Sequence, residues 1–254
     1  MVTIVITSFN SAGFIRESIE SALRQTCSET EVLIIDGAST DGTLAIIKEF
    51  ETRVKSVSEP DNGETDALQK GLAMAKGEIV NFLNSDDLLE PWATSVAVGA
   101  FKAEPRVAMV YGDTMCCGAD SSRKWGFRSY SDMTLDRLVN YDSAIAQAAG
   151  FFRKSCLDAT GGWDLRYDQM NDLELWLRML KRYPARHIPS VFATVRTHPQ
   201  AKTQRFKLQN ALESIKVRRE YGGRLFCRAN YRLLRALAVA PLARFRKKKP
   251  ALAA

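Results

Sequence analysis

Hydrophobic and polar positions alternate between two patterns over the first 111 residues of the chain. Short apolar runs rich in β-branched residues predict strands, and the longer segments between them have the spacing of amphipathic helices. Strands are predicted over residues 2–7, 31–35, 54–58, 79–83 and 107–111, and helices over residues 11–25, 40–50, 64–75 and 91–102. This β-α-β-α order predicts an α/β fold with a mostly parallel central sheet flanked by helices.

Polar side chains gather where these predicted strands end, which is where open parallel sheets bind their ligands. Asp86 and Asp87 directly follow the apolar run at residues 79–83. Burying an unpaired carboxylate costs several kcal/mol, so we expect a cation beside this pair. Mg²⁺ or Mn²⁺ would take one or two carboxylates and leave its other positions to water and to the phosphates of a nucleotide diphosphate. Such a pair alone is also common in loops and helix caps. We expect Asp36 and Asp86 at the ends of neighbouring buried strands and interpret both as functional, whereas we interpret Asp41 and Asp61 as turn or cap residues.

The second half of the chain has a different pattern. Residues 131–199 alternate less regularly, with a turn at residues 161–163 and a predicted helix over residues 171–182. We expect this region to be an addition to the sheet.

Basic residues are concentrated at the C-terminal end. The net charge of the 254 residues is +7, but residues 205–254 hold 14 Lys and Arg against two Glu, which leaves residues 1–204 with 22 basic and 27 acidic residues. From Phe226 a helical projection separates apolar from basic positions, which suits an anionic membrane surface. A helix packed on the rest of the protein is an equally good interpretation. We expect no nucleic acid partner, because no aromatic-interleaved basic groove accompanies the charge.

The cysteines and the N-terminal residues indicate a cytoplasmic location. The five cysteines form no CxxC pair and are odd in number, which argues against a zinc ribbon or a secreted disulfide framework. No signal peptide is visible, and no apolar run approaches the roughly 20 residues of a spanning helix. Association with the cytoplasmic face of a membrane is compatible with the basic C-terminal residues.

Several short motifs occur together in one order. The first four are TIVITSFN (3–10), IIDGASTDGT (34–43), SEPDNG (58–63) and FLNSDD (82–87). Farther along are GFFR (150–153), GGWD (161–164), DLELWLR (172–178) and RTH (196–198). In these motifs, over about residues 2–203, the chain resembles the inverting, nucleotide-sugar-dependent glycosyltransferases of family 2, which have the GT-A fold. Each motif is weak alone, but their shared order is specific.

The resemblance implies how the sugar donor would be bound. Asp36 would contact the nucleobase or ribose, and Asp87 would lie close to the donor sugar. Asp86 would meet a metal that bridges the diphosphate, and His198 matches a histidine that approaches the metal or the diphosphate in some members. The other expected donor contacts are Thr7, Ser8, Asn10, Asp66, Lys70, Ser85, Arg196 and Lys202.

The resemblance also implies a catalytic base and shows departures from the family pattern. The family's base lies in a Glu-Asp pair, which here is Asn171-Asp172, so Asp172 is the expected base and Glu174 the alternative. Asn84 replaces the first carboxylate of the common DxD motif. Leu68 stands where many members have an Arg that contacts the donor, which leaves that contact to Lys70 or Asp66, or leaves it absent.

We therefore expect a metal-dependent enzyme that uses Mn²⁺ or Mg²⁺ and a UDP- or GDP-sugar. The acceptor would be a hydroxyl of a saccharide or lipid-linked saccharide in cell-envelope or exopolysaccharide synthesis. Residues 1–204 would form the catalytic domain, with a donor half at about 1–115 and an acceptor half at about 116–204, followed by a basic helical extension at 205–254. The alternatives are a nucleotidyltransferase, although no glycine-rich basic loop follows the first strand, and a non-catalytic sugar- or nucleotide-binding scaffold.

Overall fold

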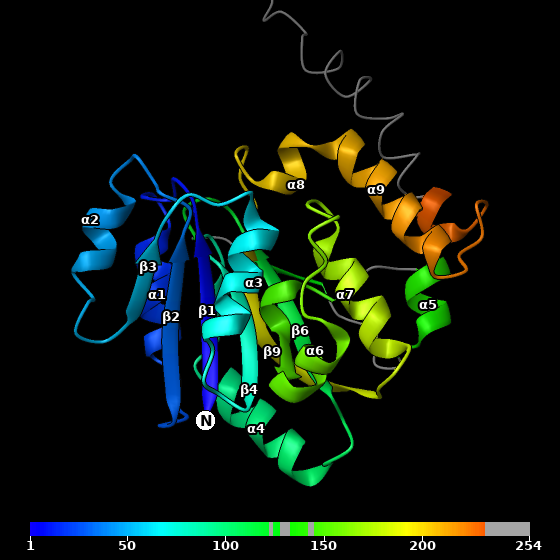
Figure 1. Ribbon diagram of the computed structural model, residues 1–254, viewed down its shortest axis with the longest axis horizontal. Coiled ribbons are helices and arrows are strands. Elements are labelled where there is room, and N and C mark those ends of the chain that lie inside the picture. The colour runs from blue at the N-terminus through cyan, green and yellow to red at the C-terminus, as the bar shows by residue number, and fades with distance from the viewer. Residues whose placement is uncertain (122–123, 128–132, 142–144, 232–254) are drawn as a thin grey trace, which may run out of the picture.

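A curved, nine-stranded sheet forms the centre of the computed structural model, which describes residues 1–121, 124–127, 133–141 and 145–231 (Figure 1). The strands are β1 (Val2–Ser8), β2 (Thr30–Asp36), β3 (Lys55–Ser58), β4 (Ile79–Asn84), β5 (Leu88–Leu89), β6 (Met109–Cys117), β7 (Lys124–Phe127), β8 (Gly150–Arg153) and β9 (Ala185–Arg196). Their spatial order is β3-β2-β1-β4-β8-β6-β9-β5, with β7 paired to β6.

Helices connect these strands. They are α1 (Ile15–Leu23), α2 (Thr43–Lys48), α3 (Glu64–Met74), α4 (Ala93–Ala103), α5 (Leu135–Asn140), the 3₁₀ turn η1 (Gln147–Ala149), α6 (Lys154–Thr160), α7 (Asn171–Leu180), α8 (Lys202–Arg205) and α9 (Lys207–Glu220). The sequence pattern predicted the α/β class correctly, and element boundaries moved by one to four residues in most cases.

Strands β3, β2, β1 and β4 are parallel, so their carboxyl ends meet at one edge of the sheet. Ser8 lies opposite Asp36, and Thr7 lies opposite Asn84. The sequence analysis placed Asp36 and Asp86 at the ends of neighbouring strands, and this was wrong because β1 lies between β2 and β4. The two carboxylates therefore occupy separate parts of that edge.

Beyond β4 the sheet is mixed. The short strand β8 is antiparallel to both β4 and β6, whereas β6 and the long strand β9 are parallel. Neither β8 nor β9 was predicted as a strand, and β6 extends six residues past the predicted end at residue 111. The irregular second half of the chain thus contributes strands to the same sheet as the first half.

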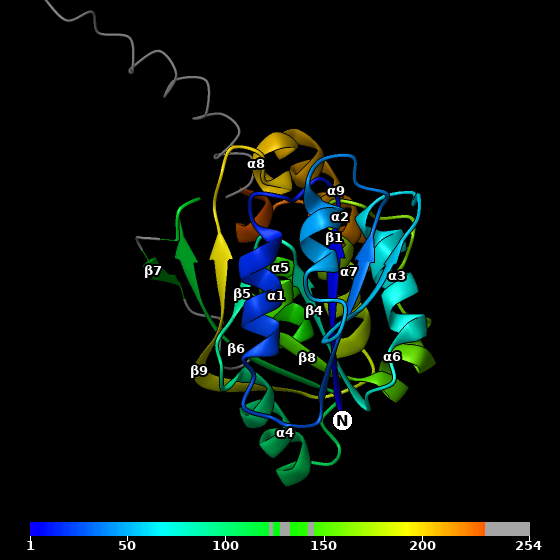
Figure 2. The same cartoon turned by 90° about the vertical axis from the view of Figure 1, so that its left-hand side faces the viewer.

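Helices cover both faces of the sheet (Figure 2), and a hydrophobic core lies on each face. Val2, Ile4 and Ile6 of β1 pack with apolar residues of α1, α2 and α4. Val5 points to the other face and packs with residues of α3, α6 and α7. Both cores use alternate residues of the same strand, which explains why β1 reads as a continuous apolar run.

Helices α8 and α9 lie at the end of the molecule toward which β1 runs (Figures 1 and 2). Helix α9 packs on the rest of the protein through Ala211, Ser214 and Val217, and the buried Arg218 donates hydrogen bonds to backbone carbonyls of α5. Most of the amphipathic segment predicted beyond Phe226 lies outside the described residues. None of the helices in the described ranges is long and apolar enough to cross a bilayer.

Candidate functional site

The turn after β4 carries the two predicted carboxylates, and the segment after β9 holds it in place. Asp86 Oδ2 lies 2.9 Å from His198 Nε2. The backbone N–H of Arg196 donates to Asp87 Oδ1 at 2.9 Å, and its Nε donates to the carbonyl of Asp86 at 2.8 Å. Burial, together with the neighbouring charge of Asp86, raises the pKa of Asp87 well above its ordinary value.

Asp86 and His198 form a pair of side chains that suits a divalent cation. The His198 ring is buried against Phe14, with ring centroids 4.4 Å apart, and its Nδ1 has no hydrogen-bond partner among the residues that the structure describes. No group of three potential His, Cys, Asp or Glu ligands occurs within the described ranges. Mg²⁺ and Mn²⁺ accept one or two protein ligands when substrate phosphates and water complete the coordination, so the pair fits a cation that arrives with a diphosphate.

Arg196 supports this turn with its side chain as well as with its backbone. Only 3% of the residue is exposed, and its guanidinium donates to the carbonyls of Asp86 and Ala119 and pairs with Glu17 at 3.2 Å. Direct contact with a donor would require some of these bonds to break. The geometry thus gives Arg196 a supporting role that the sequence analysis did not foresee.

The loops after β1 and β2 are tied together around Asp36. The Asp36 carboxylate is buried and accepts hydrogen bonds from Ser39 N at 2.9 Å, Ser39 Oγ at 2.6 Å and Ser58 Oγ at 2.8 Å. Asn10 has a left-handed backbone, with φ of 48°, and its Oδ1 accepts from the N–H of Thr40. Asp36 therefore organises the edge at which the resemblance places the nucleobase.

Three further predicted donor contacts lie at the ends of β1 and β4. Thr7 and Ser8 are buried, and Ser8 Oγ has no hydrogen-bond partner among the described residues. Ser85 donates its backbone N–H to Thr7 O and pairs its hydroxyl with that of Ser11 at 2.8 Å. These small polar side chains line the centre of the sheet edge, between Asp36 and Asp86.

The beginning of α3 contains Asp66 and Lys70 on one side and Leu68 on the other. Lys70 Nζ lies 2.9 Å from Glu59 and 3.6 Å from Asp66, and Asp66 accepts from the N–H of Asn62. Leu68 is fully buried in the core. A core residue, Leu68, thus stands in place of the arginine. Lys70, which could have taken over the donor contact, is already paired with Glu59 and Asp66.

Asp172 lies in the first turn of α7. One of its oxygens, Oδ1, accepts the N–H of Leu173 at 2.6 Å, and no hydrogen bond from a described residue reaches Oδ2. Burial raises the pKa of Asp172 to about 6, an effect that the Leu173 N–H and the Lys202 charge oppose and the Glu64 charge reinforces. A carboxylate with such a pKa is ionised at neutral pH and holds a proton more strongly than an exposed one.

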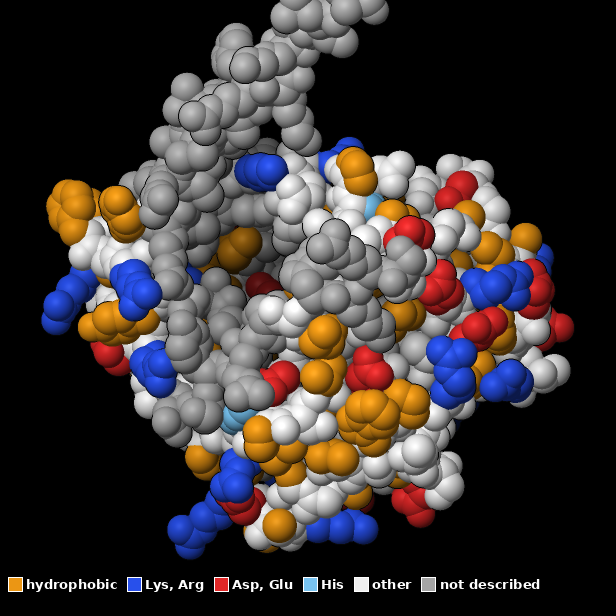
Figure 3. Space-filling view, turned by 180° about the vertical axis from the view of Figure 1, so that it is seen from behind, with side chains coloured by type: hydrophobic (Ala, Val, Ile, Leu, Met, Phe, Trp, Pro, Cys, Tyr) orange, Lys and Arg blue, Asp and Glu red, His pale blue; other side chains and the backbone are white. Residues whose placement is uncertain are grey.

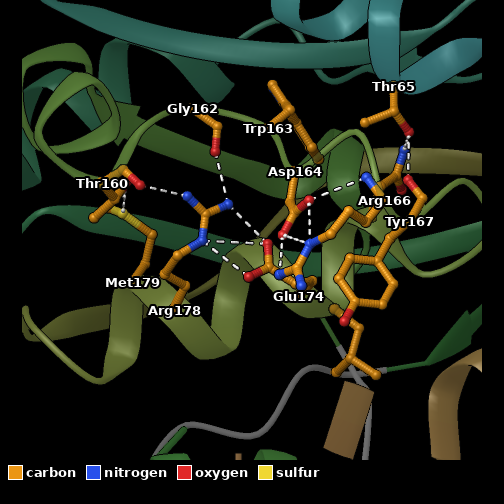
Figure 4. Close-up of polar contacts among 12 residues, drawn as sticks. Thr65, Thr160, Gly162, Trp163, Asp164, Arg166, Tyr167, Glu174, Arg178 and Met179 are labelled. Carbon is orange, nitrogen blue, oxygen red and sulfur yellow. Dashed lines mark hydrogen bonds and ion pairs between the residues drawn. The ribbon is translucent and has the colours of Figure 1, made fainter. Parts of the chain in front are cut away.

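Glu174, the alternative base, belongs to a buried structural network (Figure 4). Arg178 donates to both of its oxygens, at 2.9 and 2.7 Å, and the hydroxyl of Tyr221 donates to it at 2.6 Å. Arg178 also holds the carbonyls of Thr160 and Gly162, before and within the predicted turn at 161–163. With its lone pairs engaged in this way, Glu174 is poorly suited to accept a substrate proton, and the geometry favours Asp172.

Glu64 and Lys202 connect the two halves of the site. Lys202 Nζ lies 2.9 Å from Glu64 Oε2 and 2.9 Å from Asp168 Oδ1. The charge of Glu64 contributes to the raised pKa of both Asp87 and Asp172. Asp87, near the predicted metal position, and Asp172, the predicted base, are therefore both within electrostatic reach of one residue at the start of α3.

Gln147 is a site residue that the sequence analysis missed. It is buried in η1, and its Nε2 donates to Asn84 Oδ1 at 3.0 Å. Asn84 thus stands where the common DxD motif has a carboxylate, and it forms a neutral pair of amides with Gln147. No local signal pointed to Gln147, because it lies 63 residues away in a segment without a predicted element.

Comparisons with known proteins identify the family and the fold. The model of the family described as glycosyl transferase family 2 matches residues 3–159. A PGL/p-HBAD biosynthesis glycosyltransferase of Mycobacterium tuberculosis is 32% identical over 183 residues, which cover 70% of this chain and 69% of the relative. A chondroitin synthase of Pasteurella multocida is 27% identical over 194 residues, which cover 75% of this chain and 20% of the synthase.

Solved structures of similar fold include S. aureus TarS in complex with UDP-GlcNAc, with a TM-score of 0.68, 16% identity, and coverage of 98% of this chain and 75% of that one. Mannosyltransferase PcManGT from Pyrobaculum calidifontis, in complex with GDP-Man and Mn²⁺, has a TM-score of 0.64 and 20% identity, covering 85% and 62%. These likenesses show the GT-A fold, and the family match and the mycobacterial relative show the family. The chain belongs to glycosyltransferase family 2 and is a glycosyltransferase.

Proposed function

We propose that the enzyme moves a sugar from a UDP- or GDP-sugar to a hydroxyl of a cell-envelope or polysaccharide acceptor, with inversion at the anomeric carbon. The observation that carries this proposal is that Lys202 at the start of α8 binds both Glu64, at the start of α3 on the donor side, and Asp168, in the loop before the helix of Asp172. It is consistent with a donor site and a base that face one reacting centre. Solved neighbours that contain UDP-GlcNAc or GDP-Man support a nucleotide-sugar donor.

On the donor side, Asp86 and His198 would hold Mn²⁺ or Mg²⁺. The cation would neutralise the negative charge that develops on the leaving diphosphate, an effect worth several kcal/mol. Asp36 would bind the nucleobase or ribose through the edge that it organises, and Asp87, buried beside Asp86, would face the donor sugar. The Arg196 bonds keep the Asp86 carbonyl fixed while the donor enters.

On the acceptor side, Asp172 would take the proton of the attacking hydroxyl through Oδ2. General base assistance of this kind is worth typically about 10²- to 10⁴-fold in rate. Its pKa of about 6 leaves it ionised at neutral pH. Because the acceptor oxygen displaces the nucleotide in one step, the anomeric centre inverts and no covalent nucleophile is needed.

Release of nucleoside diphosphate tests this proposal without a known acceptor. Purified protein is incubated with UDP-, GDP- and dTDP-sugars in Mn²⁺, Mg²⁺ or EDTA, in parallel with Asp86→Ala. We expect metal-dependent release from one donor, lost in the variant. If no donor is hydrolysed and no nucleotide raises the melting temperature, the proposal of a UDP- or GDP-sugar donor is wrong.

We also propose that the α9 side of the molecule contacts an anionic membrane, where a lipid-linked acceptor would lie. Leu208 and Leu212, one turn apart on α9, are 60% and 59% exposed, and Phe226 is 95% exposed. Exposed basic residues flank them: Arg205, Lys207, Lys216, Arg219, Arg224 and Arg228. Apolar and basic side chains lie together on the left of Figure 3, which is the α9 side of the molecule seen from behind. Each Lys or Arg near such a surface contributes about 1 kcal/mol.

Vesicle sedimentation tests the membrane contact. We expect binding to vesicles that contain anionic lipid and not to neutral ones, reduced in Leu208→Glu/Leu212→Glu and in a chain that lacks residues 224–254. Unchanged binding in both variants would contradict the proposal. A dimer that dissociates in the double variant, without vesicle binding by the parent, would assign the same surface to a second copy of the chain.

A further inference from the structure

Helix α9 reaches the loop that precedes the proposed base. Glu213 Oε2 accepts the backbone N–H of Gln169 at 2.6 Å and that of Met170 at 2.7 Å, and Oε1 lies 3.4 Å from the N–H of Asp168. This helix lies beyond residues 3–159, which the family model matches. A residue from the C-terminal part of the chain thus contacts the backbone within two residues of Asp172.

Helix α7 needs an acceptor at this point. Its N-cap residue, Met170, has no side chain that can cap the helix, so the first backbone N–H groups depend on other partners. Asn171 and Asp172 each accept the N–H of the following residue. Glu213 supplies an acceptor for the N–H groups just outside the helix and places a carboxylate at the positive end of the helix dipole.

The same loop is fixed on its other side by α3. Thr65 Oγ1 donates to the carbonyl of Tyr167 at 2.8 Å and accepts from Asn171 Nδ2 at 2.9 Å. The Tyr167 hydroxyl donates to Glu220 of α9. The loop therefore lies between α3, whose first residue Glu64 belongs to the donor side, and α9, and its position sets where α7 begins.

We propose that Glu213 is a positioning residue that holds Asp172 at the correct distance from the bound donor. The inference rests on the proposed role of Asp172 as the base. Glu213 does not touch the reacting atoms; it fixes the backbone from which the base projects. A base displaced by about 1 Å can lower the rate by about 10²-fold. Loss of the two hydrogen bonds from Gln169 and Met170 to Glu213 should therefore lower the rate, because they fix the backbone next to the base.

The test compares full-length Glu213→Leu and Glu213→Gln with the parent, using the donor identified in the release assay. Glu51→Gln is the control, because it neutralises an exposed carboxylate in the turn between α2 and β3, away from this loop. We measure kcat and KM for nucleotide release, circular dichroism, and hydrogen exchange of the amides of residues 168–173.

In Glu213→Leu we expect kcat to fall about 10- to 100-fold while KM for the donor changes less than about twofold, with faster exchange at residues 169 and 170. Glu213→Gln keeps one acceptor oxygen, so its loss of kcat should be smaller, and Glu51→Gln should be near the parent. If the Leu variant does not fold, the same criteria apply to the Gln variant.

Two results would overturn the inference. One is an unchanged kcat in a folded variant whose loop amides exchange faster, which would show that the loop position does not affect the reaction. The other is a rise in KM alone, which would make Glu213 a residue of the donor site. Asp172→Asn in the same assay separates the two proposals: if it keeps full activity, the base assignment itself fails.

Discussion

Replacing Asp172 with Asn should make the protein more stable at neutral pH while it removes the activity. The pKa of Asp172 is about 6, against an ordinary value of 3.8, because burial disfavours its charged form. Between these pH values the folded chain binds more protons than the unfolded chain, so stability falls as pH rises through that window. At 1.36 kcal/mol per unit, the ionised carboxylate costs the folded state at most about 3 kcal/mol above pH 6.

The assay is urea unfolding of the parent and Asp172→Asn at several pH values from 3.5 to 8. The Asn side chain still offers an oxygen to the Leu173 N–H, so the helix start is preserved. We expect the variant to gain up to about 3 kcal/mol at pH 7 to 8 and the gain to vanish near pH 4. A gain that does not depend on pH, or a less stable variant at pH 7, would refute the idea that burial raises this pKa.

Asp41→Asn is a control in which the expected change in stability has the opposite sign to that of Asp172→Asn, because the pKa of Asp41 is lowered. Burial raises the pKa of Asp41, but hydrogen bonds from Thr43 and Ala12 outweigh it, and the net pKa is below the ordinary value. Its carboxylate therefore stabilises the fold above the ordinary pKa, and this contribution is lost as pH falls through the lowered one. The variant should be less stable than the parent at pH 7 and approach it in acid.

Three further substitutions test contacts described above. Asp86→Ala should remove the dependence of nucleotide affinity on Mn²⁺, measured by calorimetry with and without EDTA; metal-dependent binding in the variant would place the cation elsewhere. Glu174→Gln leaves Arg178 without its buried carboxylate and should lower the unfolding free energy by about 3 kcal/mol in urea titrations, whereas an unchanged midpoint would deny the network a structural role. Gly150→Ala would bring a Cβ to 2.3 Å from Trp176, whose ring is stacked on a neighbour, and should cost about 1–3 kcal/mol; wild-type thermal stability would show that this ring can move.

The parallel part of the sheet could be predicted from the sequence because its signal is local. Strands β1, β2 and β4 are buried on both faces, so each reads as a nearly continuous apolar run followed by polar residues. Asp36 and Asp86 were found at strand ends for the same reason. Strand order is a non-local property, and nothing in the runs themselves placed β1 between the other two.

Strands β8 and β9 could not be recognised because their environments differ along their length. Strand β8 has only four residues, which is too few to show an alternation of apolar and polar positions. It pairs on both sides with strands that are distant in sequence. Strand β9 mixes exposed and buried positions, and its pairing with β6 shifts register near Gly112 and Asp113. Its last residue, Arg196, could be located by motif, but its bonds to the Asp86 turn depend on this distant pairing.

The neutral pair of Asn84 and Gln147 changes how the departure from the DxD motif is understood. From the sequence, Asn84 was a loss of one metal ligand. In the structure the turn already concentrates negative charge, since burial and then the neighbouring charge of Asp86 raise the pKa of Asp87, and Glu64 adds to the effect. Position 84 belongs to the same tight turn, because the carbonyl of Asn84 accepts the N–H of Asp87. A third carboxylate at this position would increase the repulsion between the charges. An amide held by Gln147 keeps a polar side chain at position 84 without that additional charge, so the substitution is compatible with the proposed donor site.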